Sequence, residues 1–214
     1  MTTVLQSVIP ALICITLHEL AHGYVAYKLG DSTAKNEGRL TLNPIKHIDI
    51  TGLIMMLIFK FGWAKPVPVD MNNFKNPKRG MAVCALAGPA ANIIIAAVCM
   101  VLFGTTYYLK LINGSVWGFV AETLQITAYL SIALAVFNLL PIPPLDGSKI
   151  LFAVLPDSSY RKLMYVERYG MIFLIAFLFI VNRLGVNPLA SVTKAIYDQF
   201  FNLAQVVFSM LASR

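Results

Sequence analysis

The sequence contains few charged residues. Asp, Glu, Lys and Arg make up only 13% of its 214 residues, whereas a soluble domain carries about a quarter. Hydrophobic residues account for 58%, and the mean hydropathy is +0.72. This composition excludes an ordinary soluble or disordered chain. It favours an all-α polytopic membrane protein, because helices satisfy their own backbone hydrogen bonds in lipid. We expect residues 1–214 to form a single membrane-embedded domain.

Cysteine is also scarce. The chain has three, Cys14, Cys84 and Cys99, all in apolar segments and without C-x-x-C spacing. This pattern excludes a disulfide scaffold and a cysteine-ligated zinc site. We expect the three side chains to behave as small core hydrophobes.

The positive charge is unevenly distributed. The net charge is +7, and thirteen of the seventeen Lys and Arg residues fall in two connecting segments, Lys28–Arg79 and Pro141–Gly170. Such clustering between apolar segments is the positive-inside pattern, so we place both segments in the cytoplasm. The partner that this charge predicts is the anionic leaflet of the bilayer, and not a nucleic acid.

The apolar segments predict about four transmembrane helices. About 20 apolar residues span a bilayer, and the candidates are Val4–Tyr27, Met81–Gly104, Phe119–Leu140 and Leu163–Val181. The first has no basic region before it, so we expect it to be retained and not cleaved as a signal.

Two further pieces differ from these spans. Ile50–Phe61 is apolar but too short to cross, which predicts a re-entrant element on the cytoplasmic side, with short strands at Arg39–Asn43 and Lys65–Asp70 beside it. The tail, Ser191–Ser213, separates apolar from polar residues into opposite stripes. It predicts an amphipathic helix at the interface or along the helix bundle; the pattern leaves open whether that helix spans.

A short motif inside the first apolar segment carries the chemistry. Residues 18–22 read H-E-L-A-H, and on a helix this places His18 and His22 on one face, where they can share a zinc ion while Glu19 acts on its bound water. The match arises by accident in roughly one such chain in a thousand. Ionisable groups at this depth in a membrane are costly and indicate a function. The alternative is a buried histidine pair that binds no metal.

A catalytic zinc usually takes a third protein ligand. Glu122 begins the third apolar segment at its outer end, whereas His22 lies only about 9 Å of helix rise before Lys28, toward the cytoplasm. Asp146 follows the third segment at that same end, after a proline-rich stretch that can turn it inward. By itself Asp146-Gly147 is typical of a surface turn. Beside the H-E-L-A-H motif, however, we predict that Asp146 is a metal ligand. We expect His47 to be an interfacial surface histidine.

Three motifs in this order resemble the site-2 protease family of intramembrane zinc metalloproteases. They are H-E-L-A-H at 18–22, A-G-P-A-A-N at 87–92 and N-L-L-P-I-P-P-L-D-G at 138–147, and the similarity runs from about Leu12 to Ile150. Family members often have Asp-Gly-Gly where this chain has Asp146-Gly147-Ser148. Many also carry a PDZ or CBS domain, which this sequence lacks.

The resemblance implies roles for five residues. His18, His22 and Asp146 would bind one zinc ion per chain, Glu19 would be the catalytic base, and Asn138 would contact the substrate or the oxyanion. For Asn138 the alternative is a helix-end residue that satisfies freed carbonyls. The implied catalytic core covers about residues 4–152.

The predicted function is therefore hydrolysis of peptide bonds in or near transmembrane segments of membrane-protein substrates, in a prokaryotic cell membrane. The alternatives are a zinc or metal transporter and a catalytically silent membrane scaffold. Neither needs a glutamate directly after the first histidine of the motif, and a repeat-based transporter would show paired broken helices that this sequence lacks.

Overall fold

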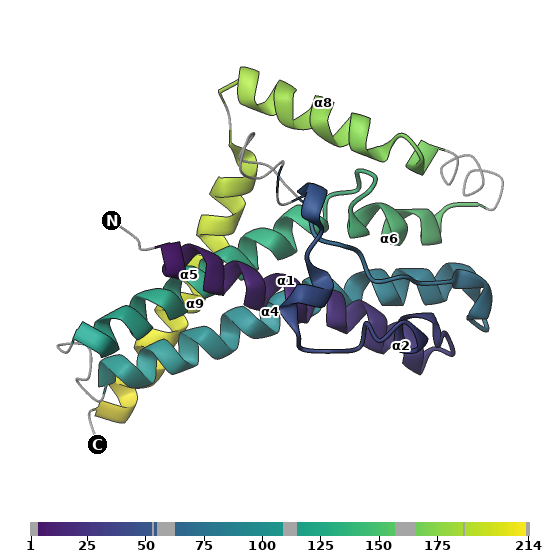
Figure 1. The fold of residues 1–214 in the computed structure, drawn as a ribbon. Helices are drawn as coiled ribbons and strands as arrows, with labels where there is room; N and C mark the ends of the chain where they lie inside the picture. Colours follow the sequence, from purple (N-terminus) through teal and green to yellow (C-terminus); the bar gives the residue numbers. More distant parts are fainter. Residues whose placement is uncertain are drawn as a thin grey trace. The chain divides into compact units, whose positions relative to one another are not determined.

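The computed structural model describes residues 4–52, 54, 63–108, 115–156, 166–185 and 187–212 (Figure 1). Within these ranges every named element is a helix, and a single antiparallel bridge joins Ile48 to Ala64. The elements are α1 (Val4–Lys28), α2 (Thr33–Asn36), η1 (Pro44–His47), η2 (Met71–Asn73), α4 (Pro77–Tyr108), α5 (Ser115–Asn138), α6 (Asp146–Val154), α8 (Gly170–Arg183) and α9 (Pro188–Ala212). The prediction of an all-α membrane protein is confirmed.

Three of the described helices, α1, α4 and α5, are long and apolar enough to cross a membrane. The 25 residues of α1 give about 37 Å of helix, against about 30 Å of hydrocarbon. The fourth predicted span is shorter than expected. Its helix, α8, has 14 residues and reaches only about 21 Å, and the first residues of the predicted span, 163–165, lie outside the described residues.

The chain divides into two compact units. The first contains Met1–Cys14, Asn92–Phe137 and Val186–Arg214, and the second contains Ile15–Ala91 and Asn138–Gly185. Each is described below by itself.

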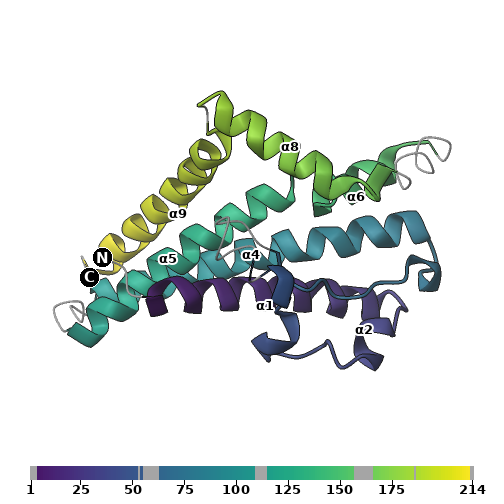
Figure 2. The same cartoon turned by 45° about the horizontal axis from the view of Figure 1, so that its top comes forward.

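In the first unit, α9 packs lengthwise against α4 and α5 (Figure 2). The rings of Tyr129 and Tyr197 lie 5.5 Å apart, and those of Phe103 and Phe201 lie 6.0 Å apart. Gly104 lies directly under the ring of Phe208, where a Cβ atom would be 1.9 Å from the ring. The predicted amphipathic tail helix therefore lies along the bundle, with aromatic side chains on its packed face.

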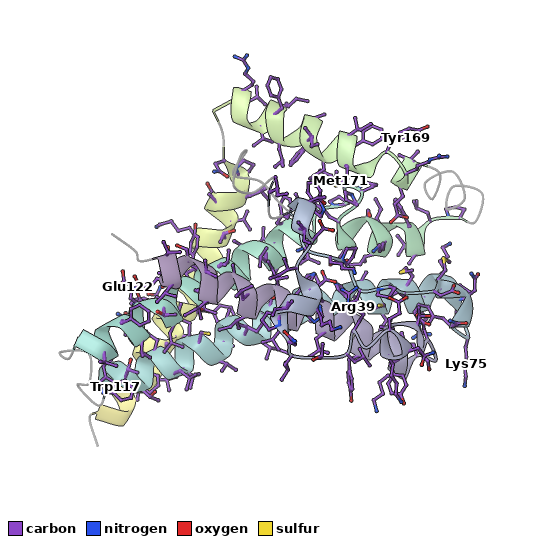
Figure 3. All side chains as sticks on the ribbon, in the orientation of Figure 1. Arg39, Lys75, Trp117, Glu122, Tyr169 and Met171 are labelled. Carbon is purple, nitrogen blue, oxygen red and sulfur yellow. The ribbon has the colours of Figure 1, made fainter. Side chains whose placement is uncertain are left out.

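The first unit also holds a polar pair. Gln6 of α1 donates a hydrogen bond of 2.7 Å to Glu122 of α5. Glu122 and Trp117 mark the early turns of α5 (Figure 3). This carboxylate therefore has a hydrogen-bond partner within the first unit.

The second unit surrounds the motif-bearing half of α1. Ala26, Phe74 and Cys84 form a buried cluster there, and Gly170 at the start of α8 packs against Pro143 and Pro144. All three cysteines of the chain are free and buried, as predicted. The Cys14 and Cys99 side chains lie in the first unit.

The expected strands do not form at residues 39–43 and 65–70. In the second of these segments, Pro66 and Pro68 lack the N–H groups that a strand ladder needs. Two of the amides that remain bond to carboxylates: Val67 N–H donates to Glu19, and Asp70 N–H donates to Asp31. The predicted re-entrant segment Ile50–Phe61 lies mostly outside the described residues.

Candidate metal centre

Two helices bring three metal-ligating side chains together. His18 and His22 are one turn apart on α1, and their Nε2 atoms lie 3.0 Å from each other. The Oδ2 atom of Asp146, the first residue of α6, lies 3.2 Å from His18 Nε2 and 3.1 Å from His22 Nε2. All three residues are buried, and their ligand atoms lie within 4.8 Å of one another. The sequence predicted this convergence.

The local sequence explains how Asp146 reaches the histidines. Helix α5 ends at Asn138, and the prolines between residues 141 and 144 prevent the chain from continuing as helix. Gly147 then packs on the backbone, where a Cβ atom would lie 2.2 Å from the carbonyl oxygen of Leu139. Asp146-Gly147 is thus the buried start of a helix, and the alternative of an exposed surface turn is wrong.

The ring of His22 is fixed by helix α4. Its Nδ1 atom lies 2.7 Å from the carbonyl oxygen of Cys84, and the Cys84 thiol donates in return to the His22 carbonyl at 3.3 Å. Since a carbonyl can only accept, Nδ1 carries the proton, and in the neutral ring this leaves Nε2 as the nitrogen that can bind a metal. A backbone carbonyl in this role is a common way to orient a metal-binding histidine.

The donor set fits a zinc ion. Ligands 2.0–2.1 Å from a tetrahedral zinc lie about 3.3 Å apart, close to the separations seen here. Asp146 Oδ2 is buried without a hydrogen-bond donor among the described residues. A metal ion among these atoms would satisfy the buried carboxylate oxygen and both ring nitrogens at once.

Gly88 of α4 leaves space beside the two histidines. A Cβ atom at this position would lie 2.4 Å from His22 Nε2 and 2.6 Å from His18 Nε2, which is nearly the bond length of a metal ligand. The volume that an ion needs is therefore left open by a missing side chain. In the sequence this glycine is distinguished only as part of the A-G-P-A-A-N motif at 87–92.

Glu19 lies between the two histidines in the sequence and is half-buried. Its Oε2 atom accepts a hydrogen bond of 2.9 Å from the main-chain amide of Val67. No sequence pattern pointed to this contact, although the alternation K-P-V-P-V at 65–69 leaves Val67 as the only amide donor between two prolines.

The sequence singled out two further residues, Asn138 and His47. Asn138 is the last residue of α5, and its role stays a prediction. The expectation that His47 is a surface residue is wrong, since it is only 1% exposed. Its Nε2 atom lies 3.0 Å from the Thr41 carbonyl, and Lys65 N–H donates to the His47 carbonyl next to the bridge between Ile48 and Ala64.

Comparison with known proteins identifies the family. The model of peptidase family M50 matches residues 107–181, a range that includes Asn138 and Asp146. YwhC of Bacillus subtilis, named as a candidate zinc metalloprotease, is 40% identical over 207 residues, which cover 95% of this chain and 93% of YwhC. The chain belongs to peptidase family M50. The resemblance to site-2 proteases is thereby confirmed, and the protein is a zinc metallopeptidase.

The match to this chain covers a smaller share of longer M50 relatives. Rip2 of Mycolicibacterium smegmatis is 30% identical over 171 residues, covering 78% of this chain and 64% of Rip2. Rip2 of Mycobacterium tuberculosis is 30% identical over 168 residues, covering 77% and 62%. Both are named as candidate zinc metalloproteases. No solved structure matches the chain.

Proposed function

We propose that this M50 peptidase hydrolyses peptide bonds within or beside the transmembrane segments of membrane-protein substrates, using one zinc ion held by His18, His22 and Asp146. The observation that carries the proposal is the convergence of these three buried ligands on α1, a helix long and apolar enough to span the bilayer. A peptidase site on such a helix suits a substrate that reaches the same depth in the membrane.

Each residue of the site has a separate chemical role. When bound, zinc polarises a carbonyl group and makes water nucleophilic at neutral pH. Glu19 accepts the proton that the attacking water loses and returns it to the departing amine, so one carboxylate serves as base and then as acid. The Cys84 carbonyl keeps His22 in the tautomer that ligates through Nε2. Asn138 supplies an uncharged amide donor for the substrate or the developing oxyanion.

The distribution of basic residues predicts on which side of the membrane cleavage takes place. With Lys28–Arg79 and Pro141–Gly170 in the cytoplasm, α1 runs from outside to inside, and His22 lies about 9 Å of helix rise before Lys28. Cleavage therefore falls in the cytoplasmic half of the substrate's membrane segment. The protein is a multi-pass membrane protein, and we place it in the prokaryotic cell membrane.

Reconstituted protein and defined substrates test this proposal. Purified enzyme in liposomes, loaded with zinc, is mixed with a panel of single-span membrane proteins, and the products are mapped by mass spectrometry. We expect cuts in the membrane segment, toward its cytoplasmic end, that a zinc chelator stops and added zinc restores. Cuts confined to soluble loops, or cleavage that survives chelation, would contradict the proposal.

A further inference from the structure

A short extended segment passes the candidate base. We call Lys65–Asp70 the strap. Its sequence is K-P-V-P-V-D, so residues 66 and 68 have no amide hydrogen, and the Val67 N–H is the single backbone donor between them. That donor bonds to Glu19 Oε2 at 2.9 Å. The prolines keep the strap extended and remove neighbouring donors, which leaves one amide aimed at one carboxylate oxygen.

The strap is fastened on both sides of this bond. At its start, Lys65 N–H donates to the His47 carbonyl at 3.0 Å, and the Arg39 guanidinium donates to the Lys65 carbonyl at 2.8 Å. Arg39 is itself buried, in the segment between α2 and η1 (Figure 3). At its end, Asp70 N–H donates to Asp31 Oδ2 at 2.8 Å. Three anchors on a six-residue segment hold it in one position.

Side-chain packing adds a fourth constraint. Val67 is 8% exposed, and its Cγ1 atom would lie 2.9 Å from a Cβ atom placed on Gly23, the residue after His22. Because Gly23 has no side chain, the strap approaches the α1 backbone closely at the level of the metal ligands. Gly23 in α1 and the extended strap together therefore place Val67 close to Glu19.

We propose that the Val67 main-chain amide is a positioning group for the catalytic base. The inference rests on the role proposed for Glu19. A glutamate side chain has three rotatable bonds, and a displacement of about 1 Å in a catalytic group can cost about 100-fold in rate. By binding Oε2, the amide sets the plane of the carboxylate and leaves Oε1 to take the proton.

If the strap were movable, the same hydrogen bond would inhibit the enzyme, because it would occupy the Glu19 carboxylate until the substrate displaced the strap. The anchors from Arg39, His47 and Asp31 favour a fixed position. The two roles predict changes of opposite sign when the amide hydrogen is removed.

Two proline variants distinguish the effect of losing the Val67 amide hydrogen from a general effect of proline on the fold. Val67→Pro removes the N–H that bonds to Glu19. Val69→Pro is the matched control, because it places the same ring two residues later, where the bond to Glu19 is untouched. We expect Val67→Pro to lower kcat about 10- to 100-fold with KM and zinc content unchanged, and Val69→Pro to keep kcat near the wild-type value. A kcat for Val67→Pro equal to wild type, or above it, overturns the inference.

Hydrogen exchange tests the bond without relying on activity or on a proline variant. Because residues 66 and 68 carry no amide hydrogen, the deuterium difference between fragments ending at Pro66 and at Pro68 reports Val67 alone. We expect slow exchange in the wild type and in Glu19→Gln, which keeps an acceptor oxygen, and faster exchange in Glu19→Ala. Equal exchange in all three proteins overturns the inference. The proposed function fails by a different result, namely wild-type cleavage by Glu19→Gln.

Discussion

At the residue scale, the site depends as much on a missing side chain as on the ligands. Gly88 leaves open the space beside His18 Nε2 and His22 Nε2. The motif at 18–22 predicted the histidines because their spacing is a property of the helix. It did not predict Gly88, the Cys84 carbonyl or the Val67 amide, because these act through backbone atoms or through an absence. His47 was mispredicted for a related reason, since its contacts are with backbone groups of Thr41 and Lys65.

Gly88→Ala should abolish zinc binding while the protein still folds, because the new methyl group would occupy the position of the ion. Gly80→Ala is the matched control on the same helix, since its Cβ atom would press on Phe74 and not on the site. Elemental analysis of the purified proteins measures the difference. A full complement of zinc in Gly88→Ala would show that the ion lies elsewhere.

Asp146→Ala should lose most of the zinc and still insert into the membrane. Of the three ligands found among the described residues, Asp146 alone comes from outside α1, and a two-histidine site binds zinc weakly. Zinc content is measured beside a membrane-extraction control. Undiminished zinc in this variant would remove Asp146 from the ligand set.

At the element scale, sequence patterns predicted where helices form better than they predicted the residues at which the helices begin and end. Hydropathy located α1, α4, α5 and α9 because apolar periodicity extends over whole helices. It overestimated α8, since an apolar run does not show that the helix begins only at Gly170. The strand predicted at residues 65–70 failed because alternation in sequence does not reveal that the carboxylates of Glu19 and Asp31 accept hydrogen bonds from the Val67 and Asp70 amides.

Asp31 fastens the loop segments to the end of α1, and its effect on stability should depend on pH. Burial alone would raise the pKa of Asp31, but hydrogen bonds from Thr33, Asn73 and the Asp70 amide outweigh burial and lower its pKa below the ordinary value. The stability that the carboxylate contributes is therefore complete above the unfolded pKa of about 3.9 and is lost as the pH falls below it.

Asp31→Asn should accordingly lower the unfolding temperature at pH 7, and its difference from the wild type should shrink below about pH 4. Thermal unfolding in detergent across this pH range measures both. A difference that stays constant down to pH 3 would mean that the charge on Asp31 contributes nothing to stability.

At the scale of the whole molecule, the order of the three motifs predicted the family, and composition predicted a membrane protein. What the sequence did not predict is the division into two compact units, because that depends on which helices pack together and not on any one segment. The orientation in the membrane rests on the placement of Lys and Arg residues.

Cysteine labelling tests the orientation. Single cysteines replacing Asn73 and Ser158 should be protected from an impermeant reagent in intact cells, and one replacing Asn113 should be labelled. The three native cysteines are buried and give a low background. The reverse pattern would invert the protein and move the cut to the outer half of the membrane.

The most direct test of the central claim is a pair of readings on one protein, Glu19→Gln. Zinc per chain and cleavage of a single-span substrate are measured in the same liposomes as for the wild type. We predict unchanged zinc, because His18, His22 and Asp146 are intact, and a loss of cleavage of at least about 10²–10⁴-fold, because the base is gone. Cleavage at the wild-type rate by the zinc-loaded variant would contradict the mechanism.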